Sequence, residues 1–420
     1  MDERDGMATM VETVRELAAG ARQAARWLAG TSSRERDELL GAMADELLGA
    51  TEAILAANSQ DLAEAADRPA AFRDRLTLTP ERVAQMAGAL RQVADLPDPL
   101  GRGESWTRPN GLRIHRVRVP LGVVGLIYEA RPNVTAEATA LALKAGNAIL
   151  LRGGSEAFRS NQAIVTALRQ GARAAGAPAE LVSLLPAGRE SARALMTTPG
   201  VVDVLIPRGG PALIRSVVEE ARVPVIETGA GNCHTYVHQD ADLEMALRIA
   251  VNAKVQRPGV CNAMETLLVH REVAAAFLPR VGEALRAHGV TLRGCPRTRE
   301  LLPWAEPATD EDWATEYLDL ILAVRVVDDL DEALDHIRRY TTGHSEAIVT
   351  RSLEAARRFQ EEVDAAAVYV NASTRFTDGG EFGFGAEVGI STQKLHARGP
   401  MGLEALTTTR YVVEGDGQIR

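Results

Sequence analysis

Three cysteines, Cys233, Cys261 and Cys295, carry the chemistry that stands out in this 420-residue chain. Their number is odd and no CxxC pair occurs, so the sequence predicts neither a disulfide framework nor a cysteine-rich zinc site. The eight histidines form no HExxH motif and no paired ligand spacing, and no metal site is expected. One remaining hypothesis is a single nucleophilic cysteine, because a thiolate attacks acyl carbons readily.

Cys261 is the first candidate for that nucleophile. It lies in the segment Arg257-Pro258-Gly259-Val260-Cys261-Asn262, where Pro-Gly predicts a turn just before an apolar strand. A turn can expose the thiol to a cleft, and the positive charges of Arg257 and Lys254 would stabilise its thiolate. Cys233, in a predicted turn beside a histidine, is a rival, and Cys295 lies in a segment predicted to be irregular. For any one of the three, a small buried apolar residue is the simpler interpretation.

The charge balance excludes some classes of function. Lys and Arg total 47 and Asp and Glu total 57, which gives a net charge of −10 and argues against binding nucleic acid or an anionic membrane through bulk charge. No apolar run approaches the ~18 residues of a membrane span, and the start MDERDG does not resemble a signal peptide. We therefore expect a cytoplasmic protein. Lysine occurs only at 144, 254 and 394; either arginine would not fit or would not do the same chemistry at these positions, or the three lysines persist by chance.

The order of predicted elements indicates an α/β protein. Helices are expected over 7–66 and 80–95, with a capping box at Ser32-x-x-Glu35, and Asn110-Gly111 predicts a hairpin turn before a strand at 112–119. A βαβ series then predicts a parallel sheet with helices on both faces. Its strands are expected at 123–128, 148–151, 181–185, 202–206 and 223–226, with helices at 136–145 and 161–175.

A second α/β series is predicted to start near Asp240. Its strands are expected at 266–269, 321–327, 347–350 and 367–370, and its helices at 272–287, 329–340 and 352–361. The segment 289–315 holds three prolines and is predicted to be irregular. Two α/β lobes are the resulting prediction. No GxGxxG is present, and Arg152-Gly153-Gly154-Ser155-Glu156 between a strand and a helix is only a weak phosphate-binding signal.

Several segments, in one order, resemble the aldehyde dehydrogenase superfamily. Pro120 to Ile127 resembles its PLGVVGxI opening, Glu227-Thr228-Gly229-Ala230-Gly231 its ELGGK segment, and Glu316 with the strand that follows its EIFGPV segment. Cys261 follows Glu227 by 34 positions, the spacing expected between that family's Glu and its nucleophilic Cys. The resemblance implies a Rossmann-like cofactor domain, an α/β catalytic domain and a small β oligomerisation element.

The resemblance is closest to the γ-glutamyl phosphate reductase branch. The segments that carry it are YEARPN at 128–133, LRGGSE at 151–156, VIETGAGNCH at 225–234 and the stretch from Val327 to Ile348. Thr341-Thr342-Gly343 departs slightly from the branch's usual Gly-Ser. The resemblance implies reduction of L-glutamate 5-phosphate by NADPH to glutamate 5-semialdehyde and phosphate, the second step of proline biosynthesis from glutamate.

The resemblance also implies roles for single residues. Cys261 corresponds to the nucleophile, and Asn133 to the residue whose amide, with the Cys261 backbone N–H, faces the oxyanion. Glu227 matches a glutamate that activates water in hydrolytic relatives. Water attack would waste the activated acyl group here, so its role stays open between orienting the nicotinamide and acting as a base on Cys261.

The remaining predicted contacts concern the cofactor and the substrate. Arg152 replaces a family lysine, which favours NADPH over NADH, and Glu316 corresponds to a residue that holds the nicotinamide ribose. The other cofactor-binding candidates are Gly153, Ser155, Arg208 and Gly209. The candidates for the anionic substrate are Arg131, Lys254, Arg257, Asn371, Ser373 and Thr374.

The expected domains follow from the same resemblance. Residues 1–108 and 121–230 are predicted to bind NADP(H), 231–370 to form the catalytic domain, and 109–120 with 371–420 to serve oligomerisation and line the site. We expect a homodimer or homotetramer and a separate glutamate 5-kinase that could associate with it. The alternatives are a CoA-acylating aldehyde dehydrogenase and a binding or regulatory protein on the same scaffold without catalysis.

Overall fold

The structure is a computed structural model that describes residues 3–420, without side chains for residues 3–5, 70 and 71. It divides into two compact units. Unit 1 comprises the chain up to Thr228 together with Gly383–Gly389 and Met401–Arg420, and unit 2 comprises Gly229–Phe382 and Ile390–Pro400. The division lies close to the predicted boundary at residue 230, whereas the predicted C-terminal segment 371–420 is shared between the units. Each unit is described below by itself.

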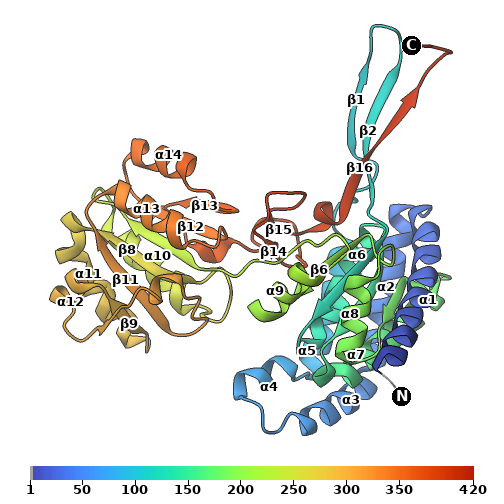
Figure 1. Ribbon diagram of the computed structural model, residues 1–420, viewed down its shortest axis with the longest axis horizontal. Helices are drawn as coiled ribbons and strands as arrows, with labels where there is room; N and C mark the ends of the chain where they lie inside the picture. Colours follow the sequence, from blue (N-terminus) through green and yellow to red (C-terminus); the bar gives the residue numbers. More distant parts are fainter. Residues whose placement is uncertain (1–2) are drawn as a thin grey trace. The chain divides into compact units, whose positions relative to one another are not determined.

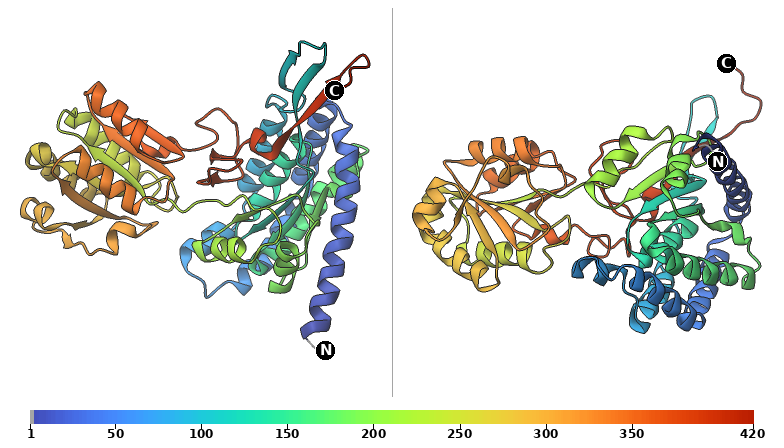
Figure 2. Two further views of the ribbon diagram at one scale, coloured as in Figure 1. Left: turned by 45° about the horizontal axis from the view of Figure 1, so that its top comes forward. Right: turned by 60° about the horizontal axis from the view of Figure 1, so that its bottom comes forward.

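The predicted N-terminal helices form the outer part of unit 1, where α1 is the long dark-blue helix of Figure 2. The capping box of α2 is present, since Ser32 and Glu35 each satisfy the other's backbone N–H. Helix α4 was not predicted. The helices of this unit are α1 (Glu3–Ala29), α2 (Ser33–Gly49), α3 (Thr51–Glu64), α4 (Ala70–Leu76), α5 (Pro80–Ala94), α6 (Pro132–Lys144), α7 (Phe158–Ala174), α8 (Arg189–Thr197) and α9 (Pro211–Glu220).

A parallel sheet in the order β5-β4-β3-β6 forms the centre of unit 1 and confirms the predicted βαβ series. The strands are β3 (Val123–Tyr128), β4 (Ala148–Gly153), β5 (Val182–Leu184) and β6 (Val204–Arg208). All six residues of β3 are buried, as expected for a strand covered on both faces. The strand predicted at 223–226 is wrong: only a single bridge joins Val225 to Leu205, because Pro224 has no N–H to extend the pairing.

A small antiparallel sheet joins distant parts of unit 1 (Figures 1 and 2). The hairpin of β1 (Gly103–Thr107) and β2 (Arg113–Pro120) confirms the predicted hairpin, with Gly111 at φ +88° in its turn. Strand β16 (Thr407–Glu414) pairs with the whole length of β2, from Thr407 opposite Pro120 to Glu414 opposite Arg113. The sequence did not reveal this third strand.

Unit 2 contains a seven-stranded parallel sheet in the order β10-β9-β11-β8-β7-β12-β13 (Figure 1). Its strands are β7 (Cys233–Val237), β8 (Met264–His270), β9 (Thr291–Gly294), β10 (Glu306–Pro307), β11 (Ile321–Val327), β12 (Ser345–Val349) and β13 (Ala367–Val370). Its helices are α10 (Leu243–Val255), α11 (Arg271–Ala287), α12 (Pro296–Leu301), α13 (Leu330–Tyr340) and α14 (Leu353–Glu362). The short strands β14 (Ile390–Ser391) and β15 (Gly399–Pro400) pair with each other.

Alternate residues of the central strands build two cores on opposite faces of the unit 2 sheet. Leu267 and Val269 join one buried cluster with Phe277 of α11. Leu268, between them, joins a second cluster with Phe359 of α14. Because neighbouring strand residues point to opposite faces, both faces are covered by helices and the strand is apolar throughout.

The sequence prediction for unit 2 needs three corrections. The segment 289–315 is not irregular, because it forms β9, α12 and β10; Pro296 is tolerated in the first turn of α12 and Pro307 in an edge strand. The series begins at β7 rather than near Asp240, since β7 carries polar residues that apolar patterning does not detect. Helix α10 was not predicted either.

Two of the three lysines are buried. Lys144 has a side-chain exposure of 1% and pairs with Asp37, and Lys254 is fully buried against Glu265. Lys394 lies on the surface and pairs with Asp364. The ammonium group is more compact than a guanidinium, so the two buried positions agree with the hypothesis that lysine persists where arginine would not fit.

Candidate active site

Cys261 lies in a turn between α10 and β8 and is partly exposed. Gly231 supports this turn, because its backbone packs directly on that of Cys261. A Cβ at residue 231 would lie 1.4 Å from the Cys261 carbonyl oxygen. Gly231 also donates its N–H to Glu316 Oε1 at 2.6 Å. Burial raises the pKa of the Glu316 carboxyl, and this hydrogen bond opposes the effect. Two predicted site residues of unit 2, Cys261 and Glu316, are therefore linked through one glycine.

The structure argues against the two other cysteines as nucleophiles. The sequence predicted Cys233 in a turn, and this prediction is wrong. Cys233 is the first residue of β7 and is fully buried. Burial raises the pKa of its thiol well above the usual value, and the nearby charge of Glu346 raises it further. The thiol donates to the Cys261 carbonyl oxygen at 3.2 Å, so Cys233 supports the turn. A thiol without solvent access that resists ionisation does not attack a substrate.

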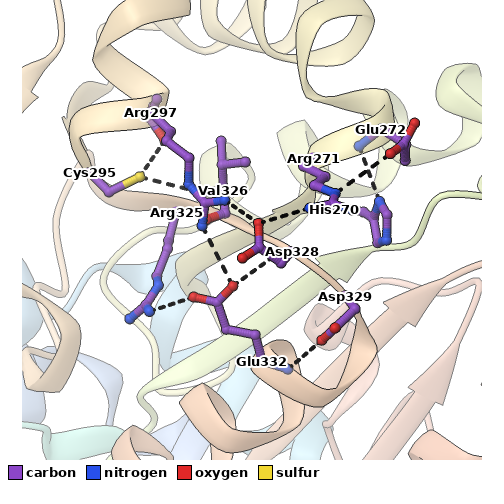
Figure 3. A network of polar contacts seen from close by, with 11 residues as sticks. His270, Arg271, Glu272, Cys295, Arg297, Arg325, Val326, Asp328, Asp329 and Glu332 are labelled. Atoms are coloured by element: carbon purple, nitrogen blue, oxygen red, sulfur yellow. Dashed lines mark hydrogen bonds and ion pairs between the residues drawn. The ribbon is translucent and has the colours of Figure 1, made fainter.

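Cys295 belongs to a polar network that ties β11 to α12 and α13 (Figure 3). It precedes α12, and its sulfur accepts the N–H of Val326 at 3.5 Å. In the same network, Arg297 binds the Val326 carbonyl oxygen at 2.6 Å, and Glu332 accepts the N–H of Asp328 at 2.6 Å. These contacts fix the start of α13, within the stretch from Val327 to Ile348 that the sequence singled out. Cys295 therefore has a structural role.

The turn of Cys261 is bound on its other side by the 3₁₀ turn Thr374–Phe376. Thr374 donates its hydroxyl to the Asn262 carbonyl oxygen at 2.7 Å, and Asn262 donates its amide to the Thr377 carbonyl oxygen at 2.9 Å. Arg375 donates Nε to Gln256 Oε1 at 3.0 Å and Nη1 to Asn262 Oδ1. The 3₁₀ turn Thr374–Phe376 thus contacts residues on both sides of Cys261.

Most of the side chains predicted to bind substrate in unit 2 are used inside the protein. Thr374 is fully buried, Ser373 accepts the N–H of Arg375, and Asn371 makes two hydrogen bonds at 2.9 Å with the backbone of Thr350. They shape the loop after β13.

Lys254 is a correction to the predicted substrate contacts. Its ammonium lies 2.6 Å from Glu265 Oε2, and both side chains are fully buried. Burial lowers the pKa of Lys254 and raises that of Glu265, and their mutual attraction opposes both shifts. A buried and paired ammonium cannot reach a substrate. Arg257, by contrast, is exposed and forms no hydrogen bond or ion pair with any residue that the structure describes.

Asn133 lies in the first turn of α6 in unit 1, and its amide is fixed by Glu137 one turn later. The distance from Asn133 Nδ2 to Glu137 Oε1 is 3.0 Å. Burial raises the pKa of Glu137, while this hydrogen bond and the positive charges of Arg208 and Arg131 lower it. The predicted oxyanion donor therefore has a fixed rotamer, and two predicted binding residues lie near the same carboxyl group.

A cavity of about 690 Å³ in unit 1 is lined by the ends of β3 and β4 and by α8 and α9. Arg152 and Ser155, both predicted to bind cofactor, line it together with Arg189 and Arg193 of α8. Arg152 donates to the Gly188 carbonyl oxygen at 2.7 Å, and its buried Nε has no partner among the described residues. Burial lowers the pKa of Arg152, and Glu156 opposes this effect. The cavity thus holds three arginines and three glutamates, Glu129, Glu156 and Glu220, at the carboxyl ends of parallel strands, where ligands bind in such sheets.

The glycine turns beside this cavity have tight packing of their own. A Cβ at Gly153 would lie 2.2 Å from Asn161 Nδ2, so glycine is needed there for close packing. Gly210, at the start of α9, donates its N–H to Glu129 Oε2 at 2.7 Å, and the same carboxylate covers Gly209. A protein carboxylate therefore lies at the start of α9, beside the predicted cofactor-binding residues Arg208 and Gly209.

Glu227 is partly buried and is the penultimate residue of the first stretch of unit 1. The following Thr228 anchors this strand-like segment by donating to the Pro207 carbonyl oxygen at 2.9 Å. Asn133, Glu227 and the residues around the cavity lie in unit 1, whereas Cys261, Glu316 and the arginines beside the nucleophile lie in unit 2.

Sequence reasoning missed several polar residues near these groups. Glu137 stands four positions after Asn133, a spacing that places two side chains on one helix face. Arg375 directly follows the predicted contacts Ser373 and Thr374. Arg189 and Arg193 are also four apart and begin a helix after a strand. The sequence positions were visible in each case, but the sequence does not show which cavity or turn each of these side chains contacts.

The part of the chain that the structure describes has neither a metal-binding cluster nor a membrane-spanning helix. No group of three or more His, Cys, Asp or Glu residues could hold a metal ion there. Among the helices over residues 3–420, none is both long and apolar enough to cross a membrane.

Cys261 is thus a partly exposed cysteine on a turn beside a parallel sheet, and the comparison with known families agrees with the resemblance that its motifs carry. The model of the aldehyde dehydrogenase family matches residues 7–293 and 310–412. The chain belongs to the aldehyde dehydrogenase family, within it to the gamma-glutamyl phosphate reductase branch. It is an oxidoreductase, and its family uses nicotinamide cofactors.

Three relatives support the assignment to that branch. Gamma-glutamyl phosphate reductase of Moorella thermoacetica is 62% identical over 404 residues, 95% of this chain and 97% of the relative. The enzyme of the same name from Carboxydothermus hydrogenoformans is 60% identical over 414 residues, 98% of this chain and 100% of the relative. The crystal structure of gamma-glutamyl phosphate reductase from Thermotoga maritima has a TM-score of 0.95 at 50% identity and covers 97% of this chain and 99% of that one. The α/β fold predicted from the sequence is confirmed.

Proposed function

We propose that this enzyme reduces L-glutamate 5-phosphate to L-glutamate 5-semialdehyde with NADPH and releases phosphate. The observation that carries the proposal is the placement of Cys261, on an accessible turn while the other two cysteines serve the structure. The names of the relatives give the substrate class, since they are gamma-glutamyl phosphate reductases at 55–62% identity.

Acyl transfer to Cys261 is the first proposed step. The Cys261 thiolate attacks the acyl carbon of the substrate, a bond forms between Sγ and this carbon, and the carbon–oxygen bond to phosphate breaks. The electron pair of that bond leaves with the phosphate. A thioester accepts hydride more readily than a carboxylate does, so the covalent step divides one difficult reduction into two easier ones.

The oxyanion of this step needs donors that are fixed in advance. We propose the Asn133 amide and the Cys261 backbone N–H for this role, and one such donor is typically worth ~3 kcal/mol. Glu137 supports the proposal because it accepts one N–H of the Asn133 amide and so fixes its orientation. An amide nitrogen carries two hydrogens, which leaves the second for the substrate.

The cavity of unit 1 fits a phosphorylated nicotinamide cofactor. Its volume of about 690 Å³ is within the range of ligand sites, and the orphaned Nε of Arg152 together with Arg189 and Arg193 supplies donors for a phosphate group. Glu129 and Glu156 line the same cavity and can accept hydrogen bonds from sugar hydroxyls. NADPH bound there would supply a hydride for the thioester carbon; the carbon–sulfur bond then breaks, its electron pair returns to Sγ of Cys261, and the semialdehyde is released. The three arginines support NADPH over NADH, because the extra phosphate of NADPH is an anion that guanidinium groups can bind.

Two glutamates have narrower proposed roles. Glu316 is proposed to hold the nicotinamide ribose through the oxygen that Gly231 leaves available. Glu227 is proposed as a site residue that orients the nicotinamide or accepts a proton from Cys261. Both roles derive from the resemblance, and both can be tested by substitution with glutamine.

The reverse reaction tests the proposal. Purified enzyme is mixed with glutamate 5-semialdehyde, which cyclises to pyrroline-5-carboxylate, and NADP⁺, and formation of NADPH is followed with and without phosphate. We expect phosphate-dependent formation of NADPH that Cys261→Ala abolishes and Cys295→Ala preserves. Reduction that needs coenzyme A instead of phosphate would assign the chain to the CoA-acylating alternative, and reduction by Cys261→Ala would refute the thioester.

The biological setting is proposed along with the reaction. The reaction would be the second step of proline biosynthesis from glutamate, after a separate glutamate 5-kinase makes the acyl phosphate. A cytoplasmic location and a homodimer or homotetramer formed through the β1-β2-β16 sheet complete the proposal. The sheet exposes Trp106, Tyr411 and Val413, which agrees with a surface that another subunit covers.

A further inference from the structure

Two arginines of unit 2, Arg257 and Arg375, lie near the nucleophile. Arg375 spans the turn of Cys261, because it binds Gln256 on one side and Asn262 on the other. Arg257 lies within the turn itself, exposed and unpaired among the described residues. Of the five N–H donors of the Arg375 guanidinium, two go to Gln256 and Asn262, and the other three have no partner in the part of the chain that the structure describes.

The electrostatics of this pair favour an anion. Burial lowers the pKa of the Arg375 guanidinium, and the charge of Arg257 lowers it further. Asp378, Cys261 and Glu381 act in the opposite direction, but among the described residues neither acid forms an ion pair with Arg375. Two like charges held close together cost free energy unless a ligand of opposite charge joins them. Fixed guanidinium donors are suited to bind phosphate through two hydrogen bonds.

We propose that Arg375 and Arg257 bind the phosphate group of the acyl phosphate while Cys261 attacks. This inference rests on the proposed function. In an acyl phosphate the phosphate oxygen is bonded to the very carbon that Sγ attacks, so the phosphate must lie beside the turn of Cys261. When the carbon–oxygen bond breaks, its electron pair goes to the phosphate, and the two guanidinium groups compensate the added charge. The α-carboxylate of the substrate is separated from that carbon by three further carbons and needs a different site.

Arg375 has a second task, because its bonds to Gln256 and Asn262 hold the turn. Its removal can disturb Cys261 for structural reasons alone. Arg257 makes no such bonds, so Arg257→Gln removes one cation and leaves the turn intact. Arg248, exposed on α10 and outside the site, offers a variant with the same loss of charge, Arg248→Gln.

The reverse reaction separates phosphate binding from semialdehyde binding, because phosphate is then a free substrate. We expect Arg257→Gln and Arg375→Gln to raise the KM for inorganic phosphate about ten- to hundredfold, the usual loss for a hydrogen bond to a charged group. The KM for the semialdehyde should change less than about twofold, and Arg248→Gln should match the wild type. A KM for phosphate that stays unchanged in both variants would overturn the proposal. A rise confined to the KM for semialdehyde would overturn it as well, and would assign the pair to the carboxylate.

A binding measurement that needs no turnover distinguishes this inference from the proposed function. Inorganic phosphate should slow the alkylation of Cys261 by iodoacetamide in the wild type, and this protection should be lost in Arg257→Gln. Protection by phosphate in an enzyme whose reverse reaction ignores phosphate would support the anion site while the proposed function fails. Equal protection in the wild type and in Arg257→Gln would refute the site.

Discussion

Substitution of Gly231 by alanine should inactivate the enzyme although residue 231 carries no functional group. The added Cβ would lie 1.4 Å from the carbonyl oxygen and 2.8 Å from the Cα of Cys261. Real Cβ atoms essentially never approach another heavy atom within 3.0 Å, so the two backbones must move apart by about 1.6 Å. Because both atoms belong to the backbone, no side-chain rotation can relieve the contact.

The displacement acts on the nucleophile itself. A misplacement of about 1 Å at a reacting group can lower the rate about hundredfold, so we expect Gly231→Ala to lose at least that factor in kcat. The hydrogen bond from the Gly231 N–H to Glu316 should be lost in the same movement. The melting temperature should fall, because a close-packed interior does not accept an extra methyl group without strain.

The assay combines the phosphate-dependent reverse reaction with the alkylation rate of Cys261 and thermal unfolding. Gly259→Ala is the matched control, since it lies in the same turn and its Cβ would meet only the Leu318 carbonyl oxygen at 3.6 Å, an ordinary contact. We expect Gly259→Ala to keep its activity within about twofold. Activity of Gly231→Ala near that of the control would show that the turn of Cys261 tolerates displacement, and the argument from its rigidity would fail.

Three further predictions concern other parts of the molecule. Arg193→Gln should raise the KM for NADP⁺ about tenfold or more and leave the KM for NAD⁺ unchanged. Initial-rate measurements with both cofactors test this. Equal effects on the two KM values would show that Arg193 does not recognise the extra phosphate. Burial raises the pKa of Asp312, but hydrogen bonds from Thr309, Arg293 and Tyr317 outweigh this and lower the pKa to about 2. The ionised Asp312 should therefore stabilise the folded state by about 2 kcal/mol above pH 4. The difference in unfolding free energy between the wild type and Asp312→Asn should vanish as the pH falls from about 4 to 2. A difference that does not depend on pH would contradict this prediction. Lys254→Met leaves the Glu265 carboxylate buried without its cation and should lower the free energy of unfolding in urea by about 3–5 kcal/mol. The double variant Lys254→Met with Glu265→Leu should recover most of this loss. A double variant as unstable as the single one would show that the buried ion pair itself is needed.

The sequence determined the elements whose pattern is local. The capping box at Ser32, the hairpin at Asn110-Gly111 and the buried strand Val123–Tyr128 each depend on residues within one element, and the structure has all three. The family followed from short motifs in a fixed order, for the same reason. The turn of Cys261 belongs to this group as well, since Pro258 and Gly259 specify it locally.

Only the tertiary structure decided which polar residues are available for chemistry. Lys254 and Arg257 are three positions apart, and both were predicted substrate contacts; one is buried against Glu265 and the other is exposed. Cys233 was predicted in a turn and lies inside a strand, because its neighbours His234 and Thr235 are polar and yet buried. Arg375 binds Gln256 and Asn262, on either side of Cys261, from more than a hundred residues away. Burial and partners of this kind arise from contacts between distant segments, and the residue types next to each position do not specify them.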